Sequence, residues 1–236
     1  SINFDCFEPL VLSAKKSGVR KFIFASSSSV YGVKNTKDVT EEASLDPLTD
    51  YSKFKAMCED ILQKYNDKNF TCCIVRPATV CGYSKRQRLD VVVNILTNLA
   101  YNTGKITIFG GPQLRPNINI NDMTNAYIFL INQKAHLISG EIYNVGFENC
   151  SVDILGDLVV KNINSTVDIE HVKTNDNRSY HISSKKIQST LGFKNNYSIE
   201  DAIKELINAF KNNLLDNPLQ NEMYFNIKRM KSINLK

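Results

Sequence analysis

Two short apolar runs that alternate with helical patterns constrain the fold of this chain more than any other feature of its sequence. The runs Lys21–Ala25 and 71–75 (KFIFA and TCCIV) are rich in aromatic, β-branched and cysteine side chains, which predicts buried strands. Apolar residues recur at helical spacing over 4–14, and a second helix is predicted over about 51–65. Strands that alternate with helices in this way predict an α/β fold with a parallel sheet.

The rest of the chain extends this pattern with shorter and more mixed elements. Further helices are predicted over about 89–101, 121–132, 153–162, 184–191 and 198–211, and further strands over about 106–109, 142–145 and 167–171. The helix over 121–132 is expected to be capped by Asn121 or Asn119, and the last helix opens with the capping-box pattern Ser198-x-x-Asp201. Because Pro9 removes a backbone hydrogen bond inside the first helical pattern, that helix is expected to start near Glu8. Because the predicted elements become shorter and more mixed from Gly104 onward, we expect a parallel-sheet portion, 1–103, and a smaller α+β lobe, 104–236, with some segments returning to the sheet.

Composition and charge exclude several classes of protein. With 42% hydrophobic and 22% charged residues the chain is expected to fold, and it is neither collagen-like nor disordered. The net charge of +5 is spread along the chain apart from one short cluster, Lys85, Arg86 and Arg88, so no nucleic acid is expected as a partner, although an anionic small ligand is compatible. No apolar run approaches the ~18 residues that span a bilayer, and no signal peptide is evident, so we expect no membrane association and a cytoplasmic location.

The cysteines give no sign of a metal site. There are six, they contain no C-x-x-C pair, and Cys72 and Cys73 lie inside an apolar run. We expect them to be small core residues in a reducing compartment, with no bound metal.

The sharpest chemical feature is Tyr51 and Lys55, which are four residues apart in the segment YSKFK. On a helix they share a face, and an ammonium beside a phenol favours the phenolate, which makes Tyr51 a candidate base. Taken alone, the pair also fits an ordinary solvated helix face. Ser27 follows the first predicted strand 24 residues earlier, and both positions fall at one edge of a parallel sheet. A serine can donate to a substrate oxygen while a tyrosine removes its proton, so the three residues suit oxidation of a hydroxyl with a nicotinamide cofactor as hydride acceptor.

Six segments of the chain resemble, in order, the motifs of one large superfamily. FASSSSVYG at 24–32, YSKFK at 51–55 and RPATVCG at 76–82 are similar to three successive motifs of the extended short-chain dehydrogenases/reductases, the NAD-dependent nucleotide-sugar epimerases and dehydratases. RPNININDM at 115–123, YNVG at 143–146 and LGF at 191–193 resemble further motifs of that superfamily. The resemblance implies a partial Rossmann-like NAD(P)-binding domain with the catalytic residues in 1–103, and a nucleotide-sugar-binding lobe mainly in 104–236.

The resemblance also implies roles for individual residues. Ser27, Tyr51 and Lys55 match the catalytic residues, with Tyr51 as acid/base and Lys55 as the residue that lowers its pKa and binds the nicotinamide ribose. Cofactor contacts are implied for Ala25, Ser26, Tyr51, Lys55, Pro77, Ala78, Thr79 and Val80, and substrate contacts for Ser27, Ser28, Asn94, Arg115 and Arg178. Both arginines would bind the pyrophosphate of the substrate, since a guanidinium makes two parallel charge-assisted bonds.

Several positions depart from the superfamily or fit a structural role. Family dehydratases carry an Asp-Glu pair directly after the catalytic serine or threonine; this chain has Ser28 and Ser29 there, so elimination of water lacks its acid and base. Cys81 stands where the family usually has tyrosine, and we expect it to pack in the core. Asp122 is expected to cap a helix or hold a loop.

The largest departure is the lack of a glycine fingerprint. None of the ten glycines forms G-x-G-x-x-G or G-x-x-G-x-x-G. In the superfamily roughly a hundred residues, with that fingerprint and the first strands of the sheet, precede the position of Ser1. We therefore expect that the chain is a fragment, that its first half is a separate polypeptide, or that its gene is degenerate.

These observations predict NAD-dependent epimerisation of a nucleotide-diphosphate sugar through a transient keto intermediate, with Tyr51 as acid/base. Two alternatives stay open: an NADPH-dependent keto-sugar nucleotide reductase or a dehydratase of the same fold, and a truncated, non-catalytic chain that cannot hold the dinucleotide. The expected cofactor is NAD, with the choice between NAD and NADP left open, and the full-length protein is expected to be a homodimer. The nucleotide, the sugar and the carbon acted on are not determined by the sequence.

Overall fold

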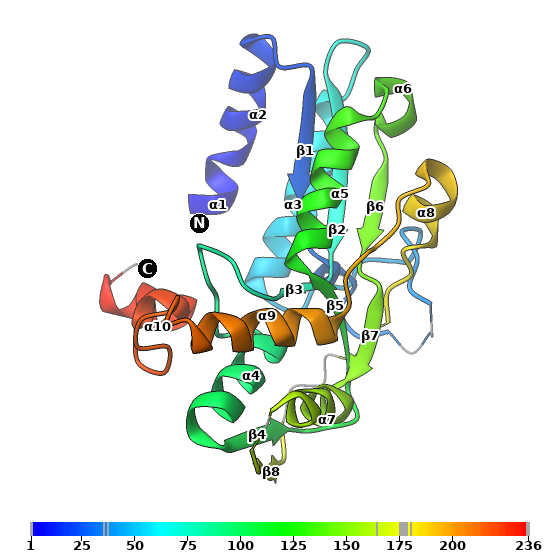
Figure 1. Cartoon of the computed structure of the whole chain (residues 1–236). Coiled ribbons are helices and arrows are strands. Elements are labelled where there is room, and N and C mark those ends of the chain that lie inside the picture. The colour runs from blue at the N-terminus through cyan, green and yellow to red at the C-terminus, as the bar shows by residue number, and fades with distance from the viewer. Residues whose placement is uncertain are drawn as a thin grey trace. The chain divides into compact units, whose positions relative to one another are not determined.

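The computed structural model describes residues 2–34, 36, 38–163, 165–174, 179 and 181–234 (Figure 1). The chain forms two compact units. Unit 1 comprises 1–78, 123–147 and 178–195, and unit 2 comprises 79–122, 148–177 and 196–236. The chain thus passes several times between the units: residues 79–103 belong to unit 2, and residues 123–147 belong to unit 1. Which part binds which ligand stays a prediction.

Unit 1 is built on a three-stranded sheet in the order β1-β2-β6, in which all pairs are parallel. Its strands are β1 (Lys21–Ala25), β2 (Thr71–Pro77) and β6 (Ile142–Val145), and its helices are α1 (Ile2–Asp5), α2 (Phe7–Lys16), η1 (Ser28–Tyr31), α3 (Asp50–Tyr65), α6 (Ala135–Ile138) and α8 (Lys185–Leu191). Side chains of α2, α3, β1 and β2 form one apolar core cluster. The helix α5 (Ile120–Asn132) begins in unit 2, and Figure 1 shows its continuation in unit 1 on the other side of the sheet from α3. The predicted α/β class with a parallel sheet is confirmed.

The strand register places the carboxyl ends of β1 and β2 side by side. Ala25 is aligned with Val75, and the amide of Ser26 donates to the carbonyl of Val75 at 2.8 Å. Ligands of open parallel sheets bind beyond these carboxyl ends of the strands. Among the described residues no strand pairs with the other side of β1, which is therefore an edge strand.

Unit 2 contains two small sheets and the helices that cover them. Its strands are β3 (Thr79–Cys81), β4 (Lys105–Phe109), β5 (Leu114–Asn119), β7 (Glu148–Ser151) and β8 (Asp168–Val172), and its helices are α4 (Val92–Thr103), α7 (Val152–Asn162), α9 (Ile199–Lys211), η2 (Glu222–Tyr224) and α10 (Asn226–Ser232). The sheets have the orders β3-β5-β7 and β4-β8. Apolar side chains of α4, α7 and α9 form its main core cluster together with residues of β4.

Local sequence rules explain where most elements begin and end. The capping box predicted at Ser198 is present, since its Oγ accepts from the amide of Asp201 at 3.1 Å. Of the two caps predicted for α5, Asn121 and Asn119, the structure has Asn119, whose Oδ1 accepts from the amide of Asn121 at 2.8 Å. Helix α2 begins at Phe7, one residue before the expected start, because Pro9 lies in the first turn, where a missing N–H breaks no helical hydrogen bond.

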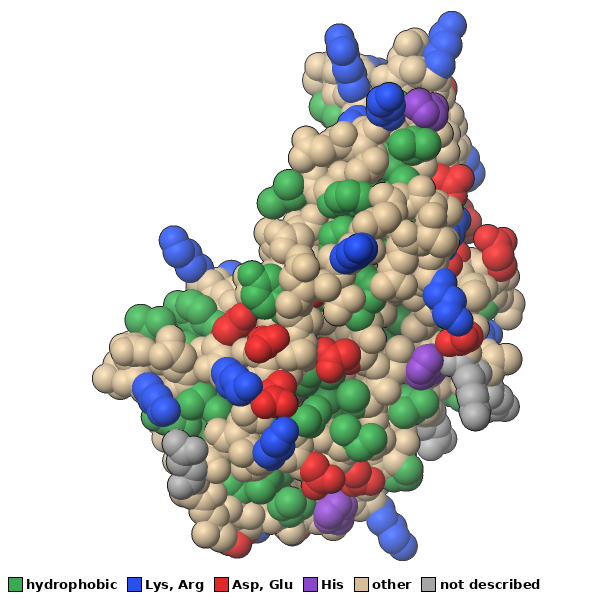
Figure 2. Space-filling model, turned by 45° about the vertical axis from the view of Figure 1, so that its right-hand side comes forward, with side chains coloured by type: hydrophobic (Ala, Val, Ile, Leu, Met, Phe, Trp, Pro, Cys, Tyr) green, Lys and Arg blue, Asp and Glu red, His purple; other side chains and the backbone are tan. Residues whose placement is uncertain are grey.

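Charges and apolar groups are mixed on the surface. On the face shown in Figure 2, blue basic side chains alternate with red acidic ones and with green apolar ones, and no continuous basic stripe appears there. Within the described ranges, no helix is long and apolar enough to cross a membrane. In the same residues, no group of three or more His, Cys, Asp or Glu side chains could hold a metal ion.

Candidate active site

The first turn of α3 carries Tyr51, and its position is fixed by a cap. The Oγ1 of Thr49 accepts from the amide of Ser52 at 3.2 Å, and the Oγ of Ser52 accepts from the amide of Thr49 at 3.1 Å. This reciprocal pair starts the helix at Asp50. Tyr51 is 55% exposed, so its phenol is accessible to a ligand.

Lys55 lies one helical turn after Tyr51 and joins α3 to the end of β1. Its Nζ lies 5.7 Å from the centre of the Tyr51 ring and 4.8 Å from that of Phe24. The same Nζ donates to the carbonyl oxygen of Ala25 at 2.7 Å. Burial lowers the pKa of the Lys55 ammonium. The predicted Tyr-Lys pair is thus together on one helix face, next to the exposed Ala25.

Ser27 forms the N-cap of η1, directly after β1. Its backbone is extended (φ −161°, ψ 142°), and its Oγ accepts from the amide of Ser29 at 3.2 Å. The hydroxyl of Ser29 lies 2.9 Å from that of Ser27. Ser28 is only 2% exposed. Ser29, which we did not predict as a site residue, is therefore the serine that contacts Ser27, and a substrate contact by Ser28 stays a prediction. The run of four serines was the only signal for Ser29.

A buried polar network lies behind these residues in unit 1. The side chain of Ser26 turns inward, and its hydroxyl donates to the Glu59 carboxylate of α3. Arg76, at the end of β2, donates to the same carboxylate, with 2.6 Å between Nη2 and Oε2. The Nη1 of Arg76 donates to the hydroxyl of Tyr31 at 2.8 Å, and Tyr31 donates to Oδ1 of Asn144 at 2.8 Å. Any cofactor contact by Ser26 would consequently come from its backbone.

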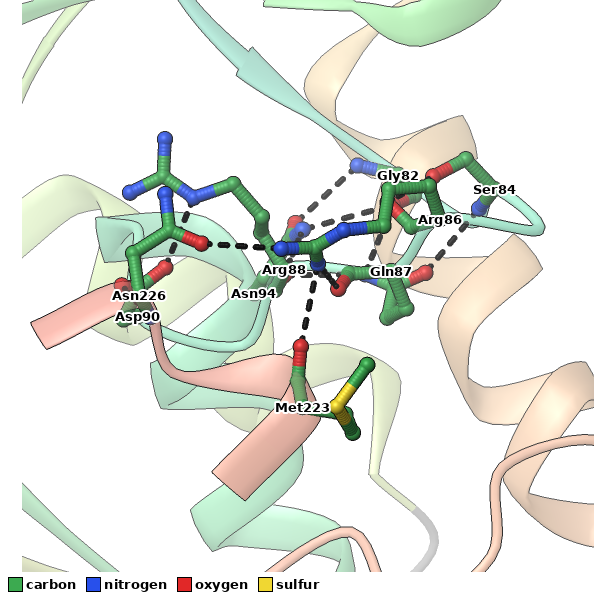
Figure 3. Close-up of polar contacts among 9 residues, drawn as sticks. All are labelled: Gly82, Ser84, Arg86, Gln87, Arg88, Asp90, Asn94, Met223 and Asn226. Carbon is green, nitrogen blue, oxygen red and sulfur yellow. Dashed lines mark hydrogen bonds and ion pairs between the residues drawn. The ribbon is translucent and has the colours of Figure 1, made fainter. Parts of the chain in front are cut away.

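In unit 2, Asn94 holds a loop rather than presenting its amide to solvent. Its Oδ1 accepts from the amide of Gly82 at 3.0 Å, and its Nδ2 donates to the carbonyl of Arg88 at 2.8 Å. Figure 3 shows these bonds together with those of Gln87, whose Oε1 accepts from the amide of Ser84 at 2.9 Å. Both polar atoms of the Asn94 side chain therefore already bind the backbone of the loop. A direct contact between Asn94 and a substrate stays a prediction.

The other predicted site residues are distributed as follows. Arg115 lies half-buried in β5, aligned with Cys150 of β7, and its Nη1 donates to the carbonyl of Leu114 at 3.2 Å. Pro77 ends β2, and Ala78 donates its amide to the carbonyl of Val145 at 2.9 Å. Thr79 and Val80 lie in β3 of unit 2. Arg178 lies outside the described residues.

Two structural expectations are confirmed in unit 2. The carboxylate of Asp122 accepts from the amides of Asn196 and Tyr197 and so holds the loop before α9. Cys81 is 1% exposed, and burial raises the pKa of its thiol far above the ordinary value. A buried, protonated thiol is suited to packing and not to catalysis.

The sequence matches one family model and several known proteins. The model of the NAD dependent epimerase/dehydratase family matches residues 1–146. The chain is 30% identical over 217 residues to a dTDP-D-glucose 4,6-dehydratase of Homo sapiens, which covers 86% of this chain and 60% of the relative. It is 29% identical over 206 residues to a putative UDP-glucose 4-epimerase of Methanocaldococcus jannaschii, covering 84% of this chain and 66% of the relative. The chain thus spans about 60% of the length of the dehydratases that it matches.

Solved structures show the same fold. A UDP-glucuronic acid 4-epimerase from Bacillus cereus, solved with UDP-glucuronic acid and NAD, is 26% identical with a TM-score of 0.78, covering 89% of this chain and 67% of that one. A dTDP-glucose 4,6-dehydratase from Bacillus anthracis, solved with NAD, has a TM-score of 0.79 at 22% identity, covering 96% of this chain and 70% of that one. The Rossmann-like fold implied by the sequence motifs is confirmed by these neighbours.

Proposed function

The chain belongs to the NAD-dependent epimerase/dehydratase family, and on this premise we propose that it carries the catalytic part of an enzyme that epimerises a nucleotide-diphosphate sugar. The observation that carries the proposal is the pairing of an exposed Tyr51 with Lys55, on a helix held against the strand end that leads into Ser27. The relatives include both epimerases and dehydratases, so the reaction type is argued from the site.

Each of the three residues has a chemical task in this reaction. Tyr51 accepts the proton of a sugar hydroxyl and later returns it, and the nearby Lys55 ammonium stabilises the phenolate. Ser27 donates a hydrogen bond to the oxygen that becomes a carbonyl. Rotation of the keto-sugar within the site then exposes its other face before the alcohol is restored.

NAD is the proposed cofactor, and when bound it would accept the hydride that leaves the sugar and, in its reduced form, return that hydride when the alcohol is restored. Lys55, Tyr51 and the exposed end of β1 at Ala25 fit the nicotinamide-ribose end of such a group, since they offer an ammonium, a hydroxyl and an exposed strand end. The ten glycines of this chain include no phosphate-binding fingerprint. The fit therefore concerns only that end of the dinucleotide, and the choice between NAD and NADP stays open.

Epimerisation is favoured over dehydration because neither of the two residues directly after Ser27 is a carboxylate. Ser28 is buried and Ser29 has its hydroxyl on Ser27, so neither can serve as the acid and base that expel a sugar hydroxyl. The identity to dTDP-D-glucose 4,6-dehydratases makes dehydration the second candidate.

Product analysis separates these reactions. The purified protein would be incubated with NAD and, in turn, UDP-glucose, UDP-glucuronic acid and dTDP-glucose, and the sugar products identified by NMR. An epimerase gives a stereoisomer with no net change in NAD, whereas a dehydratase gives a deoxy keto-sugar. In a parallel incubation with NADPH and a keto-sugar nucleotide, stoichiometric consumption of NADPH would instead identify a reductase, and would overturn the proposal.

The same family membership motivates proposals for binding and assembly. Arg115 would contact the pyrophosphate of the sugar nucleotide, and Arg115→Ala should raise KM more than it lowers kcat, because a ground-state contact is lost. The homodimer expected for the full-length protein is checked by sedimentation.

A further inference from the structure

One buried guanidinium joins the two segments that carry the proposed catalytic residues. Arg76 is 3% exposed, and its two sides contact different elements of unit 1. One side, through Nε and Nη2, faces the Glu59 carboxylate of α3. The other, through Nη1, faces the hydroxyl of Tyr31 in η1 and the carbonyl of Glu41. Arg76 is therefore shared between α3, which carries Tyr51 and Lys55, and η1, which Ser27 caps.

The contacts on α3 fix its register against β1. Tyr51, Lys55 and Glu59 follow one another at intervals of four residues and so share a helix face. Lys55 holds the carbonyl of Ala25, and Glu59 accepts from the hydroxyl of Ser26, so two successive turns bind two successive residues at the end of β1. A slip of the helix by one turn, about 5.4 Å, would break both bonds.

The contacts on η1 fix the other reacting group. Ser27 is the N-cap of this single 3-10 turn and Tyr31 is its last residue. The Tyr31 hydroxyl lies between Nη1 of Arg76 and Oδ1 of Asn144, each at 2.8 Å, and the guanidinium carbon lies 5.0 Å from the ring centre. Because η1 is so short, holding Tyr31 also holds Ser27.

We propose that Arg76 is a positioning residue that keeps Tyr51 and Lys55 in register with Ser27, by anchoring α3 through Glu59 and η1 through Tyr31. The inference rests on the proposed function only in that these three residues do the chemistry. A buried ion pair contributes little net stability, because the cost of desolvating both charges offsets their attraction. The positions that the Arg76–Glu59 pair imposes on α3 and η1 therefore explain its presence better than a contribution to folding stability does.

Two variants, each of which removes one hydroxyl group, test the network contacts on α3 and those on η1 separately. Replacing Arg76 itself would leave the Glu59 carboxylate buried without its partner, and the protein would be expected to unfold. Ser26→Ala removes the bond from β1 to Glu59 and leaves the Lys55–Ala25 bond as the other link between β1 and α3. Tyr31→Phe removes the bond from Arg76 to η1, and the Arg76–Glu59 pair stays intact in both variants. Tyr143→Phe is the matched control: Tyr143 is 1% exposed, and its hydroxyl donates to the carbonyl of Leu137 at 3.1 Å, outside the network.

In steady-state assays, Ser26→Ala and Tyr31→Phe should each lower kcat about tenfold or more, since small displacements of reacting groups are costly. KM should stay within about twofold of the parent value, because substrate binding is not altered. Two readouts need no turnover. In Ser26→Ala the titration of Tyr51, followed by NMR of ¹³C-labelled tyrosine and assigned with Tyr51→Phe, should move to higher pH as Lys55 loosens. In Tyr31→Phe the amides of η1 should exchange faster.

The control variant and the two structural readouts distinguish a failure of this proposal from a failure of the proposed function. Tyr143→Phe should keep kcat, the Tyr51 titration and the η1 exchange at their parent values. The proposal is overturned if both network variants leave all three unchanged, or if Tyr143→Phe loses as much kcat as they do. If the parent protein turns over no nucleotide sugar, the proposed function fails, and the titration and exchange data still decide the role of Arg76.

Discussion

At the residue scale, burial distinguishes two tyrosines near the proposed site, Tyr31 and Tyr51. Tyr31 is fully buried, and burial raises its pKa to about 12 although Arg76 acts in the opposite direction. A phenol with that pKa does not ionise near neutral pH. Tyr51 is exposed and has an ammonium beside its ring. Of the two, only Tyr51 suits acid/base chemistry.

Removing the Tyr51 hydroxyl tests its proposed task. Tyr51→Phe should lower kcat by about 10²- to 10⁴-fold, the usual contribution of general acid–base catalysis, and leave NAD affinity nearly intact. Steady-state kinetics and calorimetry measure the two quantities. Tyr197→Phe, which alters another exposed tyrosine, serves as control. Equal losses of turnover and affinity would contradict the assignment.

Glu41 predicts a pH dependence of stability. Burial raises the pKa of this carboxyl, whose Oε1 accepts from the amide of Asn144 at 2.6 Å. Between the unfolded value near 4.5 and the higher folded value, the folded state binds more protons than the unfolded one, so stability falls as pH rises through that window. Glu41→Gln keeps the acceptor without the charge. Its stability relative to the parent, measured by urea unfolding, should increase on going from pH 4 to neutral pH; a constant difference would contradict the assignment.

At the element scale, caps and strand ends were predictable, and polar strands were not. The capping box at Ser198 and the strand Lys21–Ala25 follow from local sequence and are confirmed. The strand β5 (LRPNIN) was missed, because its polar side chains and proline give no strand pattern. Its existence depends on backbone pairing with β3 and β7, which lie far away along the chain.

The loop at 82–90 is held by the C-terminal segment of unit 2. Arg86 donates to the carbonyl of Met223 at 3.0 Å and to Oδ1 of Asn226 at 3.1 Å (Figure 3). Arg86→Ala should speed amide exchange of η2 and α10 and cost about 1–3 kcal/mol, because hydrogen bonds from a charged donor are lost. Lys85→Ala, which removes an exposed cation from the same loop, is the control. Unchanged exchange in Arg86→Ala would show that other contacts hold the segment.

At the scale of the whole molecule, each of the two units contains an apolar core cluster of its own. Leu62 belongs to the cluster of α2, α3 and the β1–β2 strands, and Leu155 to that of α4, α7 and α9. Replacing either fully buried leucine by alanine should cost about 2–5 kcal/mol. Hydrogen exchange should accelerate mainly in unit 1 for Leu62→Ala and in unit 2 for Leu155→Ala. Equal acceleration in both units would show that the chain unfolds as one cooperative body.

The sequence alone determined the α/β class, the strands β1 and β6, the helical spacing of Tyr51 and Lys55, and the family. These properties depend on periodicity, caps and motifs within short segments. Only the tertiary structure decided that Ser26 turns inward to Glu59, that Asn94 holds a loop, and that Arg76 joins α3 to η1. Those contacts depend on partners from distant parts of the chain. The residues of one segment do not specify which distant side chain will contact them in the folded protein.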